Sequence, residues 1–168
     1  FYCNLWNINL ARQHKLSYIF LMIKKLLSIV FLGLFSVSAY AETLDEKRSK
    51  YIYNNLSFEH IECQHYLIIV SEALRTNDGD PKIIENYVSN AKLVGNVAFQ
   101  YGFKSGMSTE AMLARAKMIS DRMLKSLDNN FSNIAVIQLK YSEFCTNLIE
   151  KPEMRNQYWI NKANKKYK

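Results

Sequence analysis

The chain has 168 residues, of which 49% are hydrophobic and 22% are charged, and its formal net charge is +7. That length suits one domain with a single modest hydrophobic core. The positive charge lies at the two ends: residues 1–41 contain four bases and no acid, residues 151–168 carry +5, and residues 42–150 carry about −2. This distribution excludes nucleic-acid binding from the functions expected of the main body.

Residues 22–41 have the pattern of a secretory signal peptide. A lysine pair is followed by an apolar run over residues 26–35 and then by an A-x-A sequence. The run is too short to span a bilayer comfortably, and acidic residues follow it at once. We therefore expect export to the periplasm or secretion from the cell. The expected cleavage site, which makes residue 42 the first of the mature chain, consists of Ala39, Ala41 and Glu42.

Residues 1–21 precede this signal and begin with Phe rather than Met. We interpret them as an upstream extension that does not belong to the native protein, with translation starting at Met22. The alternative is an uncleaved apolar segment that tethers a helical domain to the membrane. Lys24 and Lys25 interrupt the apolar stretch, which disfavours one continuous membrane-spanning helix.

The main body, residues 42–150, is expected to be helical throughout. Glycine and proline are scarce, and no stretch alternates apolar and polar residues as a half-buried strand does. Side chains that favour the first position of a helix occur at Thr43, Ser57, Asp80 and Ser108.

Four or five helices follow from these starts. The first two, over residues 44–54 and 57–75, can also form one helix with an irregularity at Asn54-Asn55. Later helices are expected from residue 81 to about 102, from 108 to about 127 and from about 134 to 150. Short connections between long amphipathic helices predict an all-α fold, a small antiparallel bundle of four to five helices.

Small residues recur on one face of the expected helix over residues 81–102. Their spacing of four, three and four positions leaves room either for a close helix crossing or for a ligand groove, and close packing favours the crossing. The residues are Ala91, Gly95, Ala98 and Gly102.

Cys63 and Cys145 are the two cysteines of the expected mature chain, because Cys3 lies in the segment that precedes it. In an oxidising compartment such a pair is expected to form a disulfide. The bridge would join an early helix to a late one and, by chain-entropy arithmetic, stabilise the fold by roughly 4–5 kcal/mol.

The stretch around Cys63 also gathers groups with acid-base and metal-binding chemistry. His60 and His65 are five positions apart, so they diverge by about 140° on a helix, and no second metal-ligand motif accompanies them. We expect no metal site and no cofactor. The alternative is a periplasmic enzyme that uses His60 or His65 together with Glu59 or Glu62.

The last segment, residues 151–168, mixes basic and aromatic side chains and is expected to be a C-terminal tail. Such a tail could contact an acidic protein, anionic lipid or a polyanionic envelope polymer. The simpler interpretation is a solvated end with Trp159 packed against the bundle. The candidate partner-binding residues are Tyr158, Trp159, Lys162, Lys165 and Lys166.

The usual nucleotide, dinucleotide, zinc-protease, serine-hydrolase and haem-attachment motifs are absent from the sequence. The expected function is therefore that of an exported, non-catalytic helical binding protein with a protein or envelope partner, which meets the membrane only through its signal segment. In combining export, helices and a disulfide it is similar in architecture to the small helical periplasmic immunity proteins that block cell-wall amidases. That similarity implies an inhibitor-like or envelope-associated role.

Overall fold

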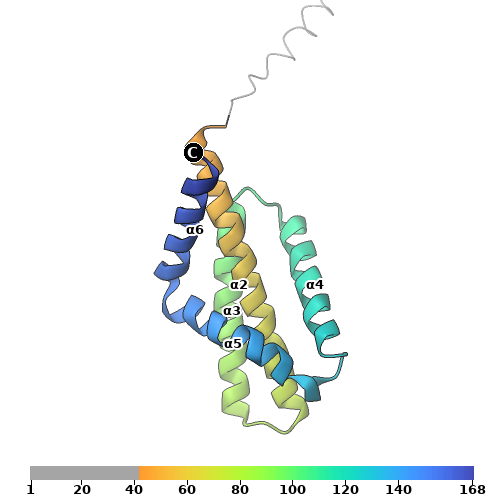
Figure 1. Ribbon diagram of the computed structural model, residues 1–168. Helices are drawn as coiled ribbons and strands as arrows, with labels where there is room; N and C mark the ends of the chain where they lie inside the picture. Colours follow the sequence, from red (N-terminus) through yellow and green to blue (C-terminus); the bar gives the residue numbers. More distant parts are fainter. Residues whose placement is uncertain (1–41) are drawn as a thin grey trace, which may run out of the picture. The chain divides into compact units, whose positions relative to one another are not determined.

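The computed structural model describes residues 42–168, and all of the regular structure in this part of the chain is helical (Figure 1). The expected signal peptide and upstream extension, residues 1–41, lie outside the described residues. The all-α fold is confirmed. Its elements are α2 (Leu44–Thr76), α3 (Pro81–Lys104), α4 (Thr109–Ser126), the 3-10 turn η1 (Phe131–Asn133), α5 (Ala135–Glu150) and α6 (Pro152–Lys166).

The first of these helices, α2, is a single helix of 33 residues. Thr43 and Glu46 form the capping box expected at its start, with the Thr43 side chain accepting from the Glu46 backbone and the Glu46 carboxylate accepting from the Thr43 backbone. The chain stays helical through Asn54-Asn55, where the Asn55 side chain donates back to the Tyr51 carbonyl. The expected irregularity is therefore not present.

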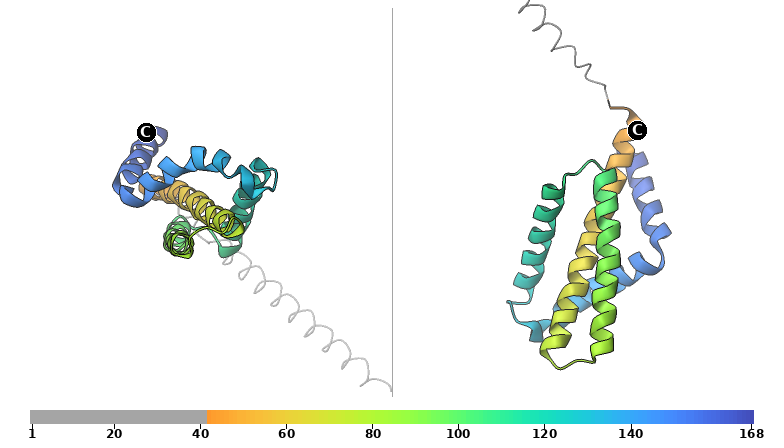
Figure 2. Two further views of the ribbon diagram at one scale, coloured as in Figure 1. Left: turned by 90° about the horizontal axis from the view of Figure 1, so that it is seen from below. Right: turned by 180° about the vertical axis from the view of Figure 1, so that it is seen from behind.

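Helices α2 and α3 form a long antiparallel pair, connected by the short turn after Thr76 (Figure 2). Asp80 caps α3 by accepting from the Lys82 backbone, and Pro81 stands in its first turn, as the sequence predicts. The expected close crossing is also found: all four small residues of α3 are buried. The Ser57 hydroxyl of α2 reaches the Ala98 carbonyl of α3 at 2.9 Å, which shows how near the two backbones lie.

The central element is α2, which contacts α3, α4, η1, α5 and α6. Three helices run roughly along it, whereas α5 lies obliquely across the half of α2 nearest the α2–α3 turn (Figures 1 and 2). The segment expected to be a tail is helical: α6 packs along the N-terminal half of α2, with Ala163 fully buried.

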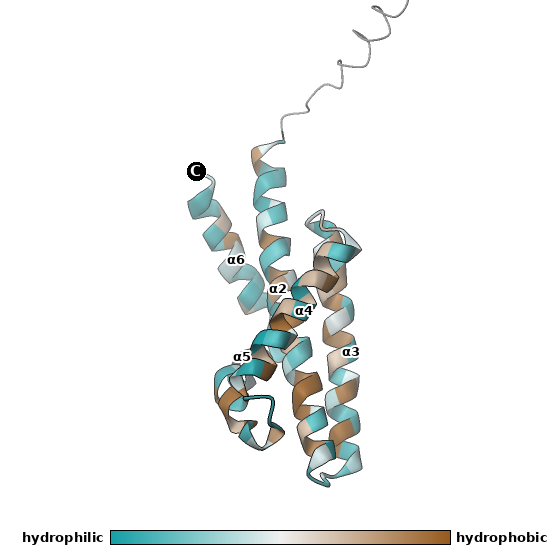
Figure 3. Cartoon of the chain, turned by 90° about the vertical axis from the view of Figure 1, so that its right-hand side faces the viewer, coloured by the Kyte–Doolittle hydropathy of each residue, from teal (hydrophilic) through white to brown (hydrophobic). Residues whose placement is uncertain are grey.

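The hydrophobic core is concentrated on the α2–α3 pair and the helices that cover it. Figure 3 shows hydrophobic residues gathered on the halves of α2 and α3 nearest their turn, whereas α6 and the start of α2 are mainly hydrophilic. Apolar residues of α4, its C-cap and α5 supply much of this core, including Ile119, Met123, Leu127, Ile137 and Leu148.

Candidate functional site

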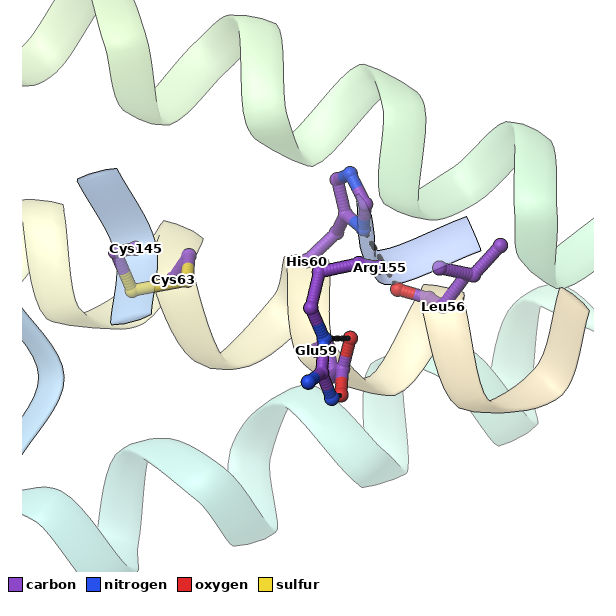
Figure 4. Close-up of a disulfide and its surroundings, with 6 residues drawn as sticks. All are labelled: Leu56, Glu59, His60, Cys63, Cys145 and Arg155. Atoms are coloured by element: carbon purple, nitrogen blue, oxygen red, sulfur yellow. Dashed lines mark hydrogen bonds and ion pairs between the residues drawn. A yellow bond between two sulfur atoms is a disulfide. The ribbon is translucent and has the colours of Figure 1, made fainter. Parts of the chain in front are cut away.

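The Cys63 and Cys145 sulfurs lie 2.11 Å apart, so the predicted pair forms a disulfide between α2 and α5 (Figure 4). Both residues are buried in the core, with at most 1% of their surface exposed. A bridged sulfur cannot act as a nucleophile. This sulfur pair therefore has a structural role, and it fixes α5 across the middle of α2.

One turn before Cys63, Glu59 points away from α3 and toward α6 (Figure 4). Its carboxylate accepts two hydrogen bonds from the Arg155 guanidinium, one from Nε at 3.1 Å and one from Nη2. The Glu59 side chain is 7% exposed and that of Arg155 27%. The ion pair thus neutralises a buried carboxylate and attaches α6 to α2.

Glu62 lies on another side of α2 and faces α4. Its carboxylate accepts from Arg122 Nη2 at 2.7 Å. Burial raises the Glu62 pKa, because it removes water from the charged carboxylate, and the nearby Arg122 partly offsets that rise. Glu62 is thus held by an arginine of a neighbouring helix, as Glu59 is.

The third group, His60, points toward α3 (Figure 4). Its Nδ1 lies 2.7 Å from the Leu56 carbonyl, which can only accept, so Nδ1 carries a proton, and in the neutral ring Nε2 keeps its lone pair. The ring packs edge-to-face on Tyr101 with centroids 5.2 Å apart. Burial lowers the His60 pKa, because it disfavours the imidazolium, and the Leu56 carbonyl and Glu59 oppose that shift.

The structure therefore does not bring the four candidate acid-base residues together. Glu59, His60 and Glu62 face α6, α3 and α4 respectively, and both carboxylates are paired with arginine. His65 is half-buried, and burial lowers its pKa as well. Within residues 42–168 there is no cluster of three or more metal-ligating side chains.

The candidate partner-binding residues of the C-terminal segment all lie on α6, and two of them contact Tyr51 of α2. Trp159 packs edge-to-face on Tyr51 with centroids 5.9 Å apart, and the Lys166 ammonium stands 4.3 Å from the Tyr51 ring centroid. Tyr158 stacks under the Arg155 guanidinium at 4.3 Å, and Lys162 lies over Tyr158. Trp159 and Lys166 thus take part in holding α6 to α2, and all of the candidates except Trp159 are exposed.

A different surface of the same helices is hollowed. We call it the α3–α6 groove: α2 forms its floor, α3 one wall and α6 the other, with the end of α5 closing it. It consists of two adjoining cavities that share Tyr101. The groove exists because α3 and α6 both pack on α2 and make little contact with each other.

The first cavity, which we call the apolar cavity, has a volume of about 320 Å³ and lies where α3 meets the α5–α6 connection. Two of its lining side chains are well exposed, Leu93 at 61% and Ile149 at 42%. His60 is its most polar lining residue. The full set is His60, Leu93, Val94, Val97, Tyr101, Leu148, Ile149 and Pro152.

The second cavity, the polar cavity, has a volume of about 350 Å³ and lies nearer the start of α2. Tyr53 and Tyr101 stack in it with ring centroids 5.7 Å apart, and the Lys104 ammonium lies 5.4 Å and 6.0 Å from those two rings. Asn156 adds an amide. The full set is Ser49, Ile52, Tyr53, Tyr101, Lys104, Asn156 and Ile160.

The helical spacing of these residues explains how the groove is built. On α3, Leu93, Val97, Tyr101 and Lys104 fall on one face beside the small-residue stripe. On α6, Pro152, Asn156 and Ile160 are spaced by four. The groove was not predicted from the sequence, in which residues 151–168 were expected to form a tail, although the spacing of four after Pro152 is typical of a helical face.

No family model, curated protein or solved structure matches the chain. Among residues 42–168, no helix is long and apolar enough to cross a membrane. Proposals about function therefore depend on the geometry of this surface and on the sequence signals.

Proposed function

We propose that the protein is exported to the periplasm or the cell exterior and acts there as a non-catalytic binding protein, which holds a segment of a partner protein in the α3–α6 groove. An inhibitor-like or envelope-associated role follows from this binding. The observation that carries the proposal is the pair of adjoining cavities on one side of the α2–α3 pair.

The character of the groove favours a protein partner. Interface cores combine apolar and aromatic side chains with a few polar groups and little net charge. The apolar cavity supplies exposed Leu93 and Ile149, and the polar cavity supplies two tyrosines, an amide and one ammonium. These groups together resemble a docking surface more than a catalytic centre.

The acid-base residues support a non-catalytic role. General acid-base catalysis requires the participating side chains to reach the same reacting group. Glu59 and Glu62 are instead each held by an arginine on a separate helix, and His60 faces α3. Of these residues only His60 lines the groove.

Export is supported by the signal-like pattern of residues 22–41 and by the Cys63–Cys145 disulfide, since stable disulfides are typical of oxidising compartments. Mass spectrometry of the protein from envelope fractions of a bacterial host tests this part. The expected chain begins at Glu42 and weighs two hydrogens less than its reduced form. A chain that retains residues 22–41 would instead support the membrane-tethered alternative.

Site-specific photo-crosslinking tests the binding part. A photo-reactive residue at Leu93 is compared with one at Leu113, a leucine of similar exposure on α4. We expect a discrete partner adduct from position 93 in envelope extracts and none from position 113. Excess unlabelled wild-type protein should compete the adduct away, whereas the groove-filling variant Val97→Trp should not. Equal adducts from both positions would contradict the proposal.

A further inference from the structure

The α3–α6 groove has one cation near its apolar cavity. This arrangement limits the chemistry of the partner segment that can bind there. Lys104 is the one Lys, Arg, Asp or Glu among the residues that line the two cavities. Within residues 42–168, Lys104 forms no salt bridge. Its ammonium is instead held over the rings of Tyr53 and Tyr101.

An ammonium in that position is ready to pair with an anion. The two tyrosine rings attract it through their negative faces and keep it above the polar cavity. A single carboxylate would satisfy this site. A polyanionic polymer, in contrast, is held by several bases acting together, and the bases of α6 near Tyr51 and Tyr158 lie outside both cavities.

The free Nε2 of His60 indicates the conformation of the segment. In an α-helix the backbone N–H groups are bonded within the helix, whereas an extended segment keeps them available for a partner. Individual side chains of an extended segment fit the two cavities, and the free Nε2 of His60 can accept a hydrogen bond from such a segment's backbone.

The helical rise sets the spacing between the two anchors. Val97 of the apolar cavity and Lys104 of the polar cavity are seven residues apart on α3, which is about 10 Å along the axis. An extended chain advances about 3.3 Å per residue. A side chain in the apolar cavity and a carboxylate at Lys104 would therefore be about three residues apart.

We infer that the α3–α6 groove binds an extended acidic peptide segment of a partner protein, in which a large apolar side chain enters the apolar cavity and an Asp or Glu about three residues away pairs with Lys104. This inference rests on the proposed function and adds the chemistry of the partner to it.

The test is selection from a displayed library of linear twelve-residue peptides, with the mature protein as bait. We expect enriched peptides to carry a large apolar residue and an Asp or Glu two to four positions away. The affinity of an enriched synthetic peptide is then measured by fluorescence anisotropy. Lys104→Glu should weaken binding about tenfold, and replacing the peptide's acid with Lys should restore part of that loss.

Matched variants separate the possible outcomes. Lys82→Glu makes the same charge change on an exposed residue at the other end of α3, and it should alter affinity less than about twofold. Leu93→Glu and Val97→Trp should abolish binding by filling or charging the apolar cavity, and circular dichroism confirms that each variant is folded. Because Leu93 is exposed, replacing it leaves the packing of the hydrophobic core unchanged.

If Leu93→Glu abolishes peptide binding and Lys104→Glu leaves the affinity unchanged, the acidic-segment inference is overturned, whereas the proposed binding in the groove is retained. If the peptide affinity is unchanged in Leu93→Glu, Val97→Trp and Lys104→Glu alike, both the inference and the proposed binding site are overturned. Selection that yields no enriched peptide would also overturn the inference.

Discussion

The guanidinium of Arg155 in α6 donates two hydrogen bonds to the buried carboxylate of Glu59 in α2, and this pair joins residues 96 positions apart in the chain. It lies beside the rings of Phe144, Tyr158 and Trp159, which cover the guanidinium. Since α6 forms one wall of the α3–α6 groove, the pair also holds that wall on α2.

Removing the positive charge of Arg155 should destabilise the fold. Arg155→Met keeps the apolar stem against the aromatic rings but leaves the Glu59 carboxylate buried without a partner. Breaking a fully buried pair costs about 3–5 kcal/mol, and the partial exposure of Arg155 reduces the expected loss to about 2 kcal/mol. Urea denaturation followed by circular dichroism measures the free energy of unfolding.

A second substitution identifies the cause of that loss. Glu59→Gln in the Arg155→Met background removes the unpaired charge and should recover about 1 kcal/mol. Lys117→Ala breaks the exposed Lys117–Asp121 pair on α4 and should change stability by less than about 0.5 kcal/mol. If the double variant were less stable than Arg155→Met, the buried charge would not be the source of the effect.

Most of the fold could be predicted from local sequence signals. The capping box at Thr43, the Asp80-Pro81 start of α3 and the Ser108 cap of α4 all lie where the sequence places them. These signals work because a helix start is specified by residues within one turn of it. The Asn54-Asn55 break was not found, since α2 packs on several helices and tertiary contacts outweigh a weak local preference.

The groove could not be predicted in the same way. It combines residues of α2 and α3 with residues of α5 and α6 from the other end of the described chain, and it depends on α3 and α6 both packing on α2. The basic composition of residues 151–168 suggested a solvated tail, because neither the Glu59–Arg155 pair nor the burial of Ala163 is visible in the sequence. Contacts between segments that are distant in sequence, such as α2 and α6, form only when the helices pack together.

Loss of the Cys63–Cys145 disulfide should lower stability without changing the helical fold. The bridge closes a loop of 82 positions between α2 and α5, and removing such a constraint typically costs 2–5 kcal/mol. The double variant Cys63→Ala/Cys145→Ala should therefore unfold at markedly lower urea concentration. Its midpoint should not change with dithiothreitol, whereas that of the wild-type protein should fall. Equal midpoints for the double variant and the oxidised wild-type protein would contradict the stabilising role.

The buried small-residue face of α3 should tolerate a methyl group at Gly95, which lies against Gln64 of α2, better than at Gly102, which lies against Met112 of α4. A Cβ at Gly102 would overlap the Met112 sulfur and lie 3.0 Å from Met112 Cγ, and Met112 is 1% exposed. A Cβ at Gly95 would meet the amide end of half-buried Gln64, which can turn aside.

The expected stability changes follow from two opposing effects. Alanine gains about 1 kcal/mol over glycine inside a helix, whereas overpacking costs about 1–3 kcal/mol. Gly95→Ala should thus be close to neutral, and Gly102→Ala should destabilise by about 1–2 kcal/mol in thermal or urea denaturation. The opposite order would mean that the Met112 side chain moves more easily than its burial indicates.

Acidification should weaken the fold through His60. Burial holds the His60 pKa below its ordinary value in the folded protein. As pH falls through about 6.5, the unfolded chain takes up a proton that the folded chain resists, so stability present at higher pH is lost. His65 contributes in the same direction, whereas the raised pKa of Glu62 favours the folded state at lower pH.

Comparison with His60→Gln isolates this contribution. Both proteins are unfolded in urea at pH 7.5 and at pH 5.5, so the effects of His65 and Glu62 are common to both and cancel. The wild-type protein should lose more of its unfolding free energy on acidification than the variant does. His65→Gln should give a smaller difference, because His65 is only half-buried. An identical loss in wild type and His60→Gln would show that the folded protein accepts a proton at His60 as readily as the unfolded chain.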